Sequence, residues 1–324
     1  MKTPVVGLHH VTAIASDPQR NLDFYTQILG LRFVKRTINF DDPGTYHFYF
    51  GDDTGQPGTI LTFFPWPHAR KGQMGAGEVI ATAFSIPVGS HSFWIERLKA
   101  NGVPVQVHTR FGSQVISFSD PDGMIIELVE QEEAHPGATP RYSDVEGPKA
   151  IQGFYGVTLL ERSLENTEEL LSIMGLRKIA EEESFVRFAP EGDALGRFID
   201  IKLDPAARRG SMGAGTVHHI AFRNTDDAAQ ADWRRTLARY LSVTPVQDRT
   251  YFHSIYFREP GGVLFEMATD NPGFLIDEPV ESLGEELRIP EWYEPNRRAI
   301  EAHIAPITLH KAAAVKEEET GVSR

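Results

Sequence analysis

The prediction of the fold starts from one stretch of the sequence, Leu8-His9-His10-Val11-Thr12-Ala13-Ile14-Ala15. Its apolar and β-branched residues predict a strand, and two adjacent histidines stand near the start of that strand. A second histidine pair stands in Val217-His218-His219-Ile220-Ala221-Phe222. Because the second histidines of the two pairs are 219 − 10 = 209 positions apart, they share one site only if the fold brings these two strands together.

A repeated pattern surrounds both strands. A strand, a helix and three further strands recur in four segments, which span residues 7–66, 78–130, 153–203 and 216–268. The spacing of apolar residues predicts their helices over residues 21–29, 92–100, 167–174 and 228–240. Turns rich in glycine, proline and acidic residues, at 120–123 and 259–262, precede the last strands of the second and fourth segments.

These segments divide the chain into two halves. We expect an N-terminal half over residues 1–131, a linker over 132–150, a C-terminal half over 151–270 and a tail over 271–324. The linker is rich in proline, glycine and charged residues, and a shorter glycine-rich and basic linker is expected over residues 67–77. The tail has scattered prolines and one expected helix, over residues 296–303.

The repeat also predicts the fold class. A helix can cover only one face of the sheet in its own unit, so units must pair to enclose the other face. We therefore predict an α+β fold of four βαβββ modules that form two open, barrel-like cups. If the histidine pairs share a cup, module 1 pairs with module 4, and module 2 pairs with module 3. The second cup has Ala81 and Gly156 at the places of the ligand-type histidines and contributes only Glu127, so we expect it to be structural or vestigial.

Composition and charge narrow the function classes. The chain has 324 residues, with 32 Lys and Arg against 45 Asp and Glu, for a formal net charge of −13. Its basic pairs are scattered, so no nucleic-acid partner is expected. Because there is no cysteine, any metal must be held by His, Asp or Glu. No apolar run is long enough for a membrane span and no secretory signal is seen, so we expect a cytoplasmic protein.

Three residues have the chemistry of a metal site. Strand alternation places His10 on the open face of the cup together with Thr12, and it places His219 on the corresponding face of its own strand. Glu266 lies in an apolar strand, where an unpaired carboxylate would be costly to bury. Two imidazoles and one carboxylate, with open positions remaining, are the ligands of non-heme iron(II) sites that activate oxygen. The same alternation predicts that His9 and His218 point behind the sheet.

The motifs also resemble a known family. The repeated units are similar to those of the vicinal oxygen chelate (glyoxalase/bleomycin-resistance/extradiol dioxygenase) superfamily, and details resemble its hydroquinone ring-cleaving dioxygenase branch. The stretches that carry the resemblance are Leu8-His9-His10-Val11-Thr12, Arg32-Phe33-Val34-Lys35-Arg36-Thr37, Pro57-Gly58-Thr59, Arg110-Phe111-Gly112, His218-His219, Tyr251-Phe252-His253-Ser254 and Pro260-Gly261-Gly262-Val263-Leu264-Phe265-Glu266. The resemblance extends over nearly the whole chain, from residue 8 to residue 306.

This resemblance implies an iron(II) or manganese(II) site that opens an aromatic ring with O2. It implies His10, His219 and Glu266 as metal ligands. It places a further set of residues around the metal and the substrate pocket: Thr12, His9, His218, Arg249 and Tyr256. His253 stands where some chlorohydroquinone-cleaving relatives have an acidic residue, so the ring substituents of the substrate are left open. Relatives with this architecture often associate, which implies a homo-oligomer.

Other functions compete with this hypothesis. A catechol substrate, cleaved by an extradiol dioxygenase, would fit the same ligands. A lyase or isomerase of the glyoxalase type would require a second carboxylate ligand, but the last strand of the first segment has Thr62 and Phe63 at that place. A resistance protein that only sequesters a small molecule would need apolar walls and no metal, so the triad argues against it.

Overall fold

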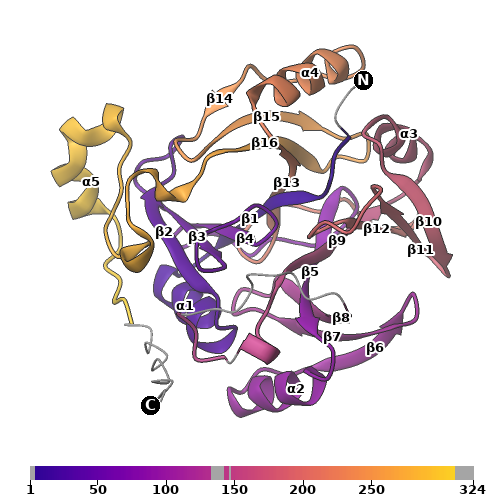
Figure 1. Cartoon of the computed structure of the whole chain (residues 1–324), viewed down its shortest axis with the longest axis horizontal. Coiled ribbons are helices and arrows are strands. Elements are labelled where there is room, and N and C mark those ends of the chain that lie inside the picture. Colours follow the sequence, from indigo (N-terminus) through magenta and orange to yellow (C-terminus); the bar gives the residue numbers. More distant parts are fainter. Residues whose placement is uncertain (1–3, 133–141, 146, 311–324) are drawn as a thin grey trace, which may run out of the picture.

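The computed structural model describes residues 4–132, 142–145 and 147–310. Most of the expected linker 132–150 and the end of the expected tail therefore lie outside the described residues. Within the described part of the chain, the strands form two eight-stranded sheets, each of which curls into a cup (Figure 1). The predicted α+β fold is confirmed.

The first sheet combines strands of the first and fourth segments. Its strand order is β14-β15-β16-β13-β1-β4-β3-β2. In that order the strands are Gln247–Asp248, Phe252–Arg258, Leu264–Pro272, Val217–Asn224, Leu8–Ala15, Ile60–Pro65, Tyr46–Gly51 and Arg32–Ile38. At its centre β1 runs antiparallel to β13, which confirms the predicted pairing of module 1 with module 4.

The second sheet repeats this arrangement with the other two segments. Its order is β10-β11-β12-β9-β5-β8-β7-β6. In that order the strands are Arg177–Glu182, Phe185–Ala189, Phe198–Leu203, Gly153–Glu161, Glu78–Pro87, Ile125–Gln131, Ser113–Ser119 and Gln106–Arg110. Antiparallel β5 and β9 form the centre, as predicted for modules 2 and 3.

Four helices, one from each module, cover the outer faces of the two sheets, and the fifth belongs to the C-terminal tail (Figure 1). The helices are α1 (Pro18–Asp23), α2 (His91–Ala100), α3 (Glu165–Ile173), α4 (Asp227–Leu237) and α5 (Arg297–His303). A single π turn over Phe24–Ile28 continues α1, and 3-10 turns span Gly147–Lys149, Phe274–Ile276, Val280–Ser282 and Glu291–Asn296. The first helix begins earlier than its apolar spacing predicts because Asp17 caps it and Pro18 fits its first turn.

The two glycine-rich loops between modules pair with each other. Residues 70–77 read Arg-Lys-Gly-Gln-Met-Gly-Ala-Gly and residues 208–215 read Arg-Arg-Gly-Ser-Met-Gly-Ala-Gly. The backbones of Gln73 and Ser211 donate hydrogen bonds to each other's carbonyl groups, both at 2.9 Å. An added Cβ at Gly75 would lie 2.4 Å from the Arg208 carbonyl oxygen, so this close approach requires glycine. The expected linker 67–77 is therefore also a contact between the two halves of the chain.

The C-terminal tail covers the outer edge of the first sheet. It follows β2, and α5 lies outside that strand (Figure 1). Lys35 on β2 is fully buried, and its Nζ atom lies 2.6 Å from Asp277 Oδ1 and also contacts Glu278. The Arg288 backbone donates a 2.9 Å hydrogen bond to the Arg36 carbonyl group. The tail therefore satisfies an edge strand that would otherwise expose its backbone.

The second cup is filled with buried ion pairs. Arg187 forms two hydrogen bonds with Asp200, at 2.7 and 2.8 Å, and Arg110 donates one of 3.1 Å to Glu127. All four side chains are buried. This arrangement is consistent with the structural role expected for that cup, because paired guanidinium groups balance carboxylates that could not be buried alone.

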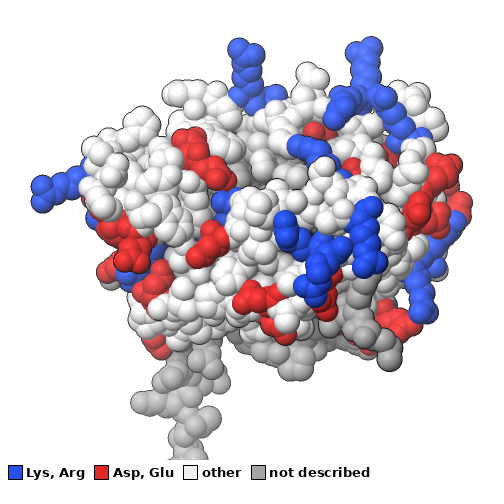
Figure 2. Space-filling view, turned by 90° about the horizontal axis from the view of Figure 1, so that it is seen from above, with Lys and Arg blue, Asp and Glu red and all other residues white. Residues whose placement is uncertain are grey.

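The surface carries both signs of charge. On the face shown in Figure 2, acidic and basic side chains lie close to one another, and the described residues form no continuous basic stripe across it. None of the described helices has the length and apolar composition needed to span a bilayer.

A pair of buried glutamates joins the two sheets within the C-terminal half. Glu161 ends β9, and Glu259 lies in the turn before β16, where it accepts 2.8 Å hydrogen bonds from the backbones of Gly261 and Val263. Burial, together with the neighbouring Glu259, raises the pKa of Glu161 to about 8. Glu161 is therefore protonated at neutral pH and donates a hydrogen bond to Glu259.

This pair predicts that stability depends on pH. The folded protein retains a proton on Glu161 that the unfolded chain loses above the ordinary pKa of 4.5, so the free energy of unfolding falls as pH rises from there to about 8. Replacing Glu161 by Gln keeps a donor to Glu259 without that cost. We expect Tm to rise by about 5 °C near pH 8 and by about 1 °C at pH 5.

Thermal unfolding at several pH values tests this prediction. Glu285→Gln is the control, because Glu285 is exposed and its replacement changes the net charge equally. A Tm difference between Glu161→Gln and the unmodified protein that is the same at pH 5 and pH 8 would contradict the pKa assignment.

Candidate metal centre and active site

The candidate site lies where β1 and β13 pair. Thr12 stands opposite His219, and His10 stands opposite Ala221. The register shifts at His9 and again at His218, so each is an extra residue, or β-bulge, in its strand. These bulges are related by the internal symmetry of the sheet.

The bulges correct the prediction made from strict alternation. The prediction that His9 and His218 point behind the sheet was wrong, since a bulge interrupts the two-residue period. Leu8 and Val11, three positions apart, both pack in the core beneath the helices. His9 and His10 instead contact each other through their Nδ1 atoms at 2.9 Å, and His218 and His219 do so at 2.7 Å.

Three side chains predicted from the sequence converge at one point. His10 Nε2 lies 3.3 Å from His219 Nε2 and 3.3 Å from Glu266 Oε2. His219 Nε2 lies 2.9 Å from the same carboxylate oxygen. All three residues are buried. Each offers one ligand atom, and these atoms lie within 4.8 Å of one another.

The chemistry of these atoms fits a divalent cation. In the part of the chain that the structure describes, no donor forms a well-directed hydrogen bond to Glu266 Oε2, although the atom is buried. Burial alone would raise the pKa of Glu266, but His10 and His219 hold it well below its usual value, so the group is a carboxylate. Two imidazole nitrogens and an unsatisfied carboxylate oxygen form a suitable ligand set for iron(II), manganese(II) or zinc(II).

The bulge histidines orient the histidines of the triad. Burial and the charge of His10 lower the pKa of His9 well below its usual value, and burial and the neighbouring His219 lower the pKa of His218 to about 3. Neutral His9 and His218 can each accept a hydrogen bond from the Nδ1–H group of their neighbour. The Nε2 atoms of His10 and His219 are then free to bind a cation.

A residue that the sequence analysis did not single out holds the carboxylate. Ser254 on β15 is fully buried, and its hydroxyl donates a hydrogen bond to Glu266 Oε1. The other oxygen, Oε2, is thereby directed to the two histidines. Ser254 lies two residues before Tyr256 on one face of the strand, and this alternation is the signal that would have identified it.

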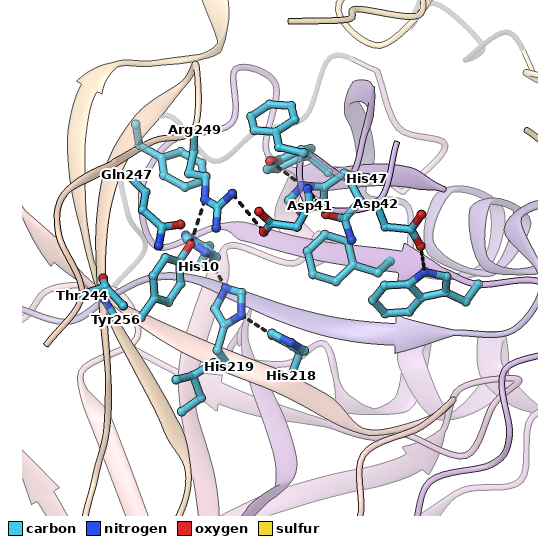
Figure 3. Close-up of a pocket in the computed structure, with 17 residues that line it drawn as sticks. His10, Asp41, Asp42, His47, His218, His219, Thr244, Gln247, Arg249 and Tyr256 are labelled. Atoms are coloured by element: carbon cyan, nitrogen blue, oxygen red, sulfur yellow. Dashed lines mark hydrogen bonds and ion pairs between the residues drawn. The ribbon is translucent and has the colours of Figure 1, made fainter. Parts of the chain in front are cut away.

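A cavity of about 400 Å³ opens beside the triad (Figure 3). Its walls combine aromatic and apolar side chains with polar and charged ones, an arrangement that suits a small molecule. The lining residues are His10, Asn39, Phe40, Asp41, Asp42, His47, Tyr49, Phe64, Trp66, His218, His219, Thr244, Gln247, Arg249, Phe252, Tyr256 and Leu264.

Besides His218, module 4 contributes the predicted pocket residues Arg249 and Tyr256 to this cavity. Arg249 Nε donates a 3.2 Å hydrogen bond to the Tyr256 hydroxyl, and Arg249 Nη1 lies 3.2 Å from Asp41 Oδ2 across the cavity (Figure 3). Burial would lower the pKa of Arg249, but Tyr256 and Asp41 raise it above its usual value. Burial and Glu266 raise the pKa of Tyr256, which therefore stays a neutral phenol. The pair places a fixed cation and a hydroxyl near the triad.

The tail supports the opposite wall. Phe40, which lines the cavity, packs against Trp292 with ring centroids 5.6 Å apart. The Tyr293 hydroxyl donates a 3.1 Å hydrogen bond to the Phe40 carbonyl group. Residues far apart in the sequence therefore position the loop that holds Asp41.

Two predicted site residues, Thr12 and His253, do not line the cavity. His253 lies on the opposite side of β15, where its Nδ1 is 2.6 Å from Asp227 Oδ1 at the start of α4. Thr12 is fully buried and its hydroxyl accepts a 2.8 Å hydrogen bond from Thr62. The structure therefore brings Thr12 near the triad through Thr62, whereas His253 faces the helix.

The internal symmetry explains why the triad has three members. Thr62 on β4 pairs with Thr12 on β1, just as Glu266 on β16 pairs with Ala221 on β13. Thr62 therefore occupies the place that corresponds to Glu266. A threonine is too short to act as a second carboxylate ligand, so one side of the candidate metal is left open.

Comparisons with known proteins point to one family. The "Glyoxalase/Bleomycin resistance protein/Dioxygenase superfamily" model matches residues 7–128. The chain is 50% identical over 313 residues to "Putative ring-cleaving dioxygenase MhqO" of Bacillus subtilis (strain 168), which covers 96% of this chain and 99% of that protein. It is 36% identical over 299 residues to "Chlorohydroquinone/hydroquinone 1,2-dioxygenase" of Sphingobium indicum, which covers 88% of this chain and 91% of that protein.

Solved structures give the same result for the fold. The crystal structure of a "putative dioxygenase" from Bacillus subtilis has a TM-score of 0.92 at 50% identity, and the match covers 96% of this chain and 100% of that chain. Glyoxalase I from Zea mays has a TM-score of 0.62 at 13% identity, covering 86% of this chain and 97% of that chain. The second similarity is one of fold alone.

The Ser254 contact predicts an effect on metal affinity. Replacing Ser254 by Ala leaves Glu266 without its orienting donor, so we expect the affinity for zinc(II) to fall about 10-fold to 100-fold while the fold is retained. Calorimetric titration of the metal-free protein measures this affinity, and circular dichroism checks the fold. Ser119→Ala, at an exposed position on β7, is the matched control. Equal affinities in both variants would show that Glu266 does not depend on Ser254.

Proposed function

The chain belongs to the glyoxalase/bleomycin resistance protein/dioxygenase superfamily, and on this premise we propose that it is a metal-dependent dioxygenase that opens a hydroquinone-type aromatic ring with O2. The observation that carries the proposal is the convergence of His10, His219 and Glu266 beside a cavity with aromatic walls. Three ligands on one side of a metal leave positions for both a phenolic substrate and O2.

The proposed metal is iron(II), with manganese(II) as the alternative. His10, His219 and Glu266 would hold it. When bound, such a metal lowers the pKa of a phenol and allows an electron-rich ring to react with O2. Both ions accept two imidazoles and one carboxylate, so the ligand set supports either of them.

The cavity residues would prepare the substrate. Phe64, Trp66 and Phe252 offer flat apolar surfaces that hold an aromatic ring and exclude water. Tyr256 would donate its hydroxyl hydrogen to an oxygen atom at the site. Arg249 would hold Tyr256 in place and stabilise negative charge that develops on the substrate.

A hydroquinone is the proposed substrate class because of the relative named for chlorohydroquinone and hydroquinone. The ligand set would serve a catechol equally, so the two substrates must be compared directly. Thr62 argues against a lyase of the glyoxalase type, since it stands where a second carboxylate would be required.

The proposal predicts oxygen consumption. After anaerobic reconstitution with iron(II), and in parallel with manganese(II), we expect stoichiometric O2 uptake and a ring-opened chromophore with methylhydroquinone or a chlorinated hydroquinone. An oxygen electrode and ultraviolet absorbance provide the measurements, with catechol as the competing substrate. His219→Ala removes one ligand and should abolish both signals. Tight metal binding without O2 uptake on any of these substrates would reject the proposed activity.

Tyr256 gives a second prediction. Replacing Tyr256 by Phe removes one hydroxyl near the triad, so we expect turnover to fall about 10-fold to 100-fold with unchanged metal content. Steady-state O2 uptake and metal analysis test this, and Tyr240→Phe, at an exposed position, is the control. Unchanged turnover would remove Tyr256 from the mechanism.

A further inference from the structure

A second polar chain lines the cavity on the side of module 1. The Tyr49 hydroxyl lies 2.8 Å from His47 Nδ1, and His47 Nε2 lies 2.8 Å from Thr62 Oγ1. Thr62 in turn donates a 2.8 Å hydrogen bond to Thr12. Tyr49, Thr62 and Thr12 are fully buried. Both Tyr49 and His47 line the cavity, so a ligand in the cavity can reach the end of this chain.

His47 was not among the site residues expected from the sequence. Strand alternation places His47 and Tyr49 on the same face of β3, whereas Tyr46 and Phe48 pack in the core on the other face. The ring of His47 contacts Tyr49 and Phe64, with centroids 4.1 and 4.4 Å away. Both ring nitrogens have partners, so its orientation is fixed.

The internal symmetry shows what Tyr49 faces. Tyr49 pairs with Thr62 across β3 and β4, just as Tyr256 pairs with Glu266 across β15 and β16. Tyr49 therefore occupies in module 1 the place that Tyr256 occupies in module 4. The side of the triad next to Thr62 lacks a carboxylate, so Tyr49 faces the side on which an external ligand can reach the metal.

The neutral His47 and Tyr49 favour a phenol as the ligand on this side of the cavity. Burial and the nearby His10, His219 and Arg249 hold the pKa of His47 well below its usual value, so its ring is neutral. Burial also raises the pKa of Tyr49. Because Thr62 donates its hydrogen to Thr12, neutral His47 donates from Nε2 to Thr62 and accepts the Tyr49 hydrogen at Nδ1. The Tyr49 oxygen can therefore accept a hydrogen bond from a substrate hydroxyl, and it adds no charge that would compete with the metal.

We propose that Tyr49, held in place by His47, is a positioning residue that accepts a hydrogen bond from a phenolic hydroxyl of the substrate on the side of the metal left open by Thr62. This inference rests on the proposed function and extends it from the ligand triad to module 1. The module 1 wall and the module 4 wall of the cavity then have similar roles, because each has one tyrosine whose hydroxyl is hydrogen-bonded to a basic side chain. The partner of Tyr256 is the cation Arg249, whereas the partner of Tyr49 is the neutral His47.

Binding of matched probes tests this assignment without turnover. The protein is loaded with zinc(II), which has no redox chemistry, and titrated with 4-nitrophenol and with nitrobenzene. The probes differ by one hydroxyl. We expect the unmodified protein to prefer 4-nitrophenol, and Tyr49→Phe and His47→Phe to reduce that preference about tenfold without changing nitrobenzene affinity or zinc stoichiometry. Calorimetry and the absorbance of 4-nitrophenol give the two affinities.

Tyr46→Phe is the matched control, since it removes a hydroxyl from the opposite face of the same strand and should leave the preference unchanged. The inference is overturned if Tyr49→Phe keeps the full preference, if nitrobenzene affinity falls equally, or if the unmodified protein has no preference. If Tyr49→Phe reduces the preference for 4-nitrophenol but the protein consumes no O2 with any aromatic substrate, the proposed dioxygenase activity is rejected. The contact between Tyr49 and a phenol is then still supported. If the protein consumes O2 but Tyr49→Phe does not change the preference for 4-nitrophenol, the dioxygenase proposal stands and the role of Tyr49 is rejected.

Discussion

The antiparallel pairing of β1 with β13 is the interaction on which the candidate site depends. It joins residues more than 200 positions apart and places His10 and His219 on neighbouring strands. Each strand gains one extra residue by a β-bulge, and that residue is the neighbouring histidine. The bulges bring both members of each pair to the site, so that one imidazole can bind a metal while the other fixes its orientation.

The second cup has the same strand arrangement but no histidines at the corresponding positions. Glu127 pairs with its central strand as Glu266 does, but Ala81 and Gly156 stand where the first cup has its triad histidines. The positive charge in this cup comes from Arg110 and Arg187, whose guanidinium groups bind the carboxylates directly. One cup is therefore closed by internal ion pairs, and the other retains a converging ligand set and a cavity. The same strand arrangement therefore accommodates buried carboxylates in two ways, by pairing them with arginines in one cup and with histidines in the other.

Much of the architecture could be predicted from periodicity and from the repeat. The four segments, the α+β class and the module pairing follow from strand and helix patterns together with the two histidine pairs. Strict alternation failed at His9 and His218 because a bulge depends on how two strands fit together, which neither strand reveals alone. His47 was missed for a related reason. Its alternation with Tyr49 is visible, but which face of β3 lines the cup is decided by the neighbouring strands.

The sequence by itself determined the chemical groups: two histidine pairs, a carboxylate in an apolar strand, and no cysteine to compete for a metal. It also determined the local elements, since side-chain pattern and capping act over a few residues. Only the tertiary structure decided which nitrogen faces the carboxylate, that Ser254 and Thr62 shape the two sides of the site, and that the tail supports the wall holding Asp41. These features arise from contacts between segments far apart in the chain, whose distances and directions depend on packing and are not encoded in local spacing.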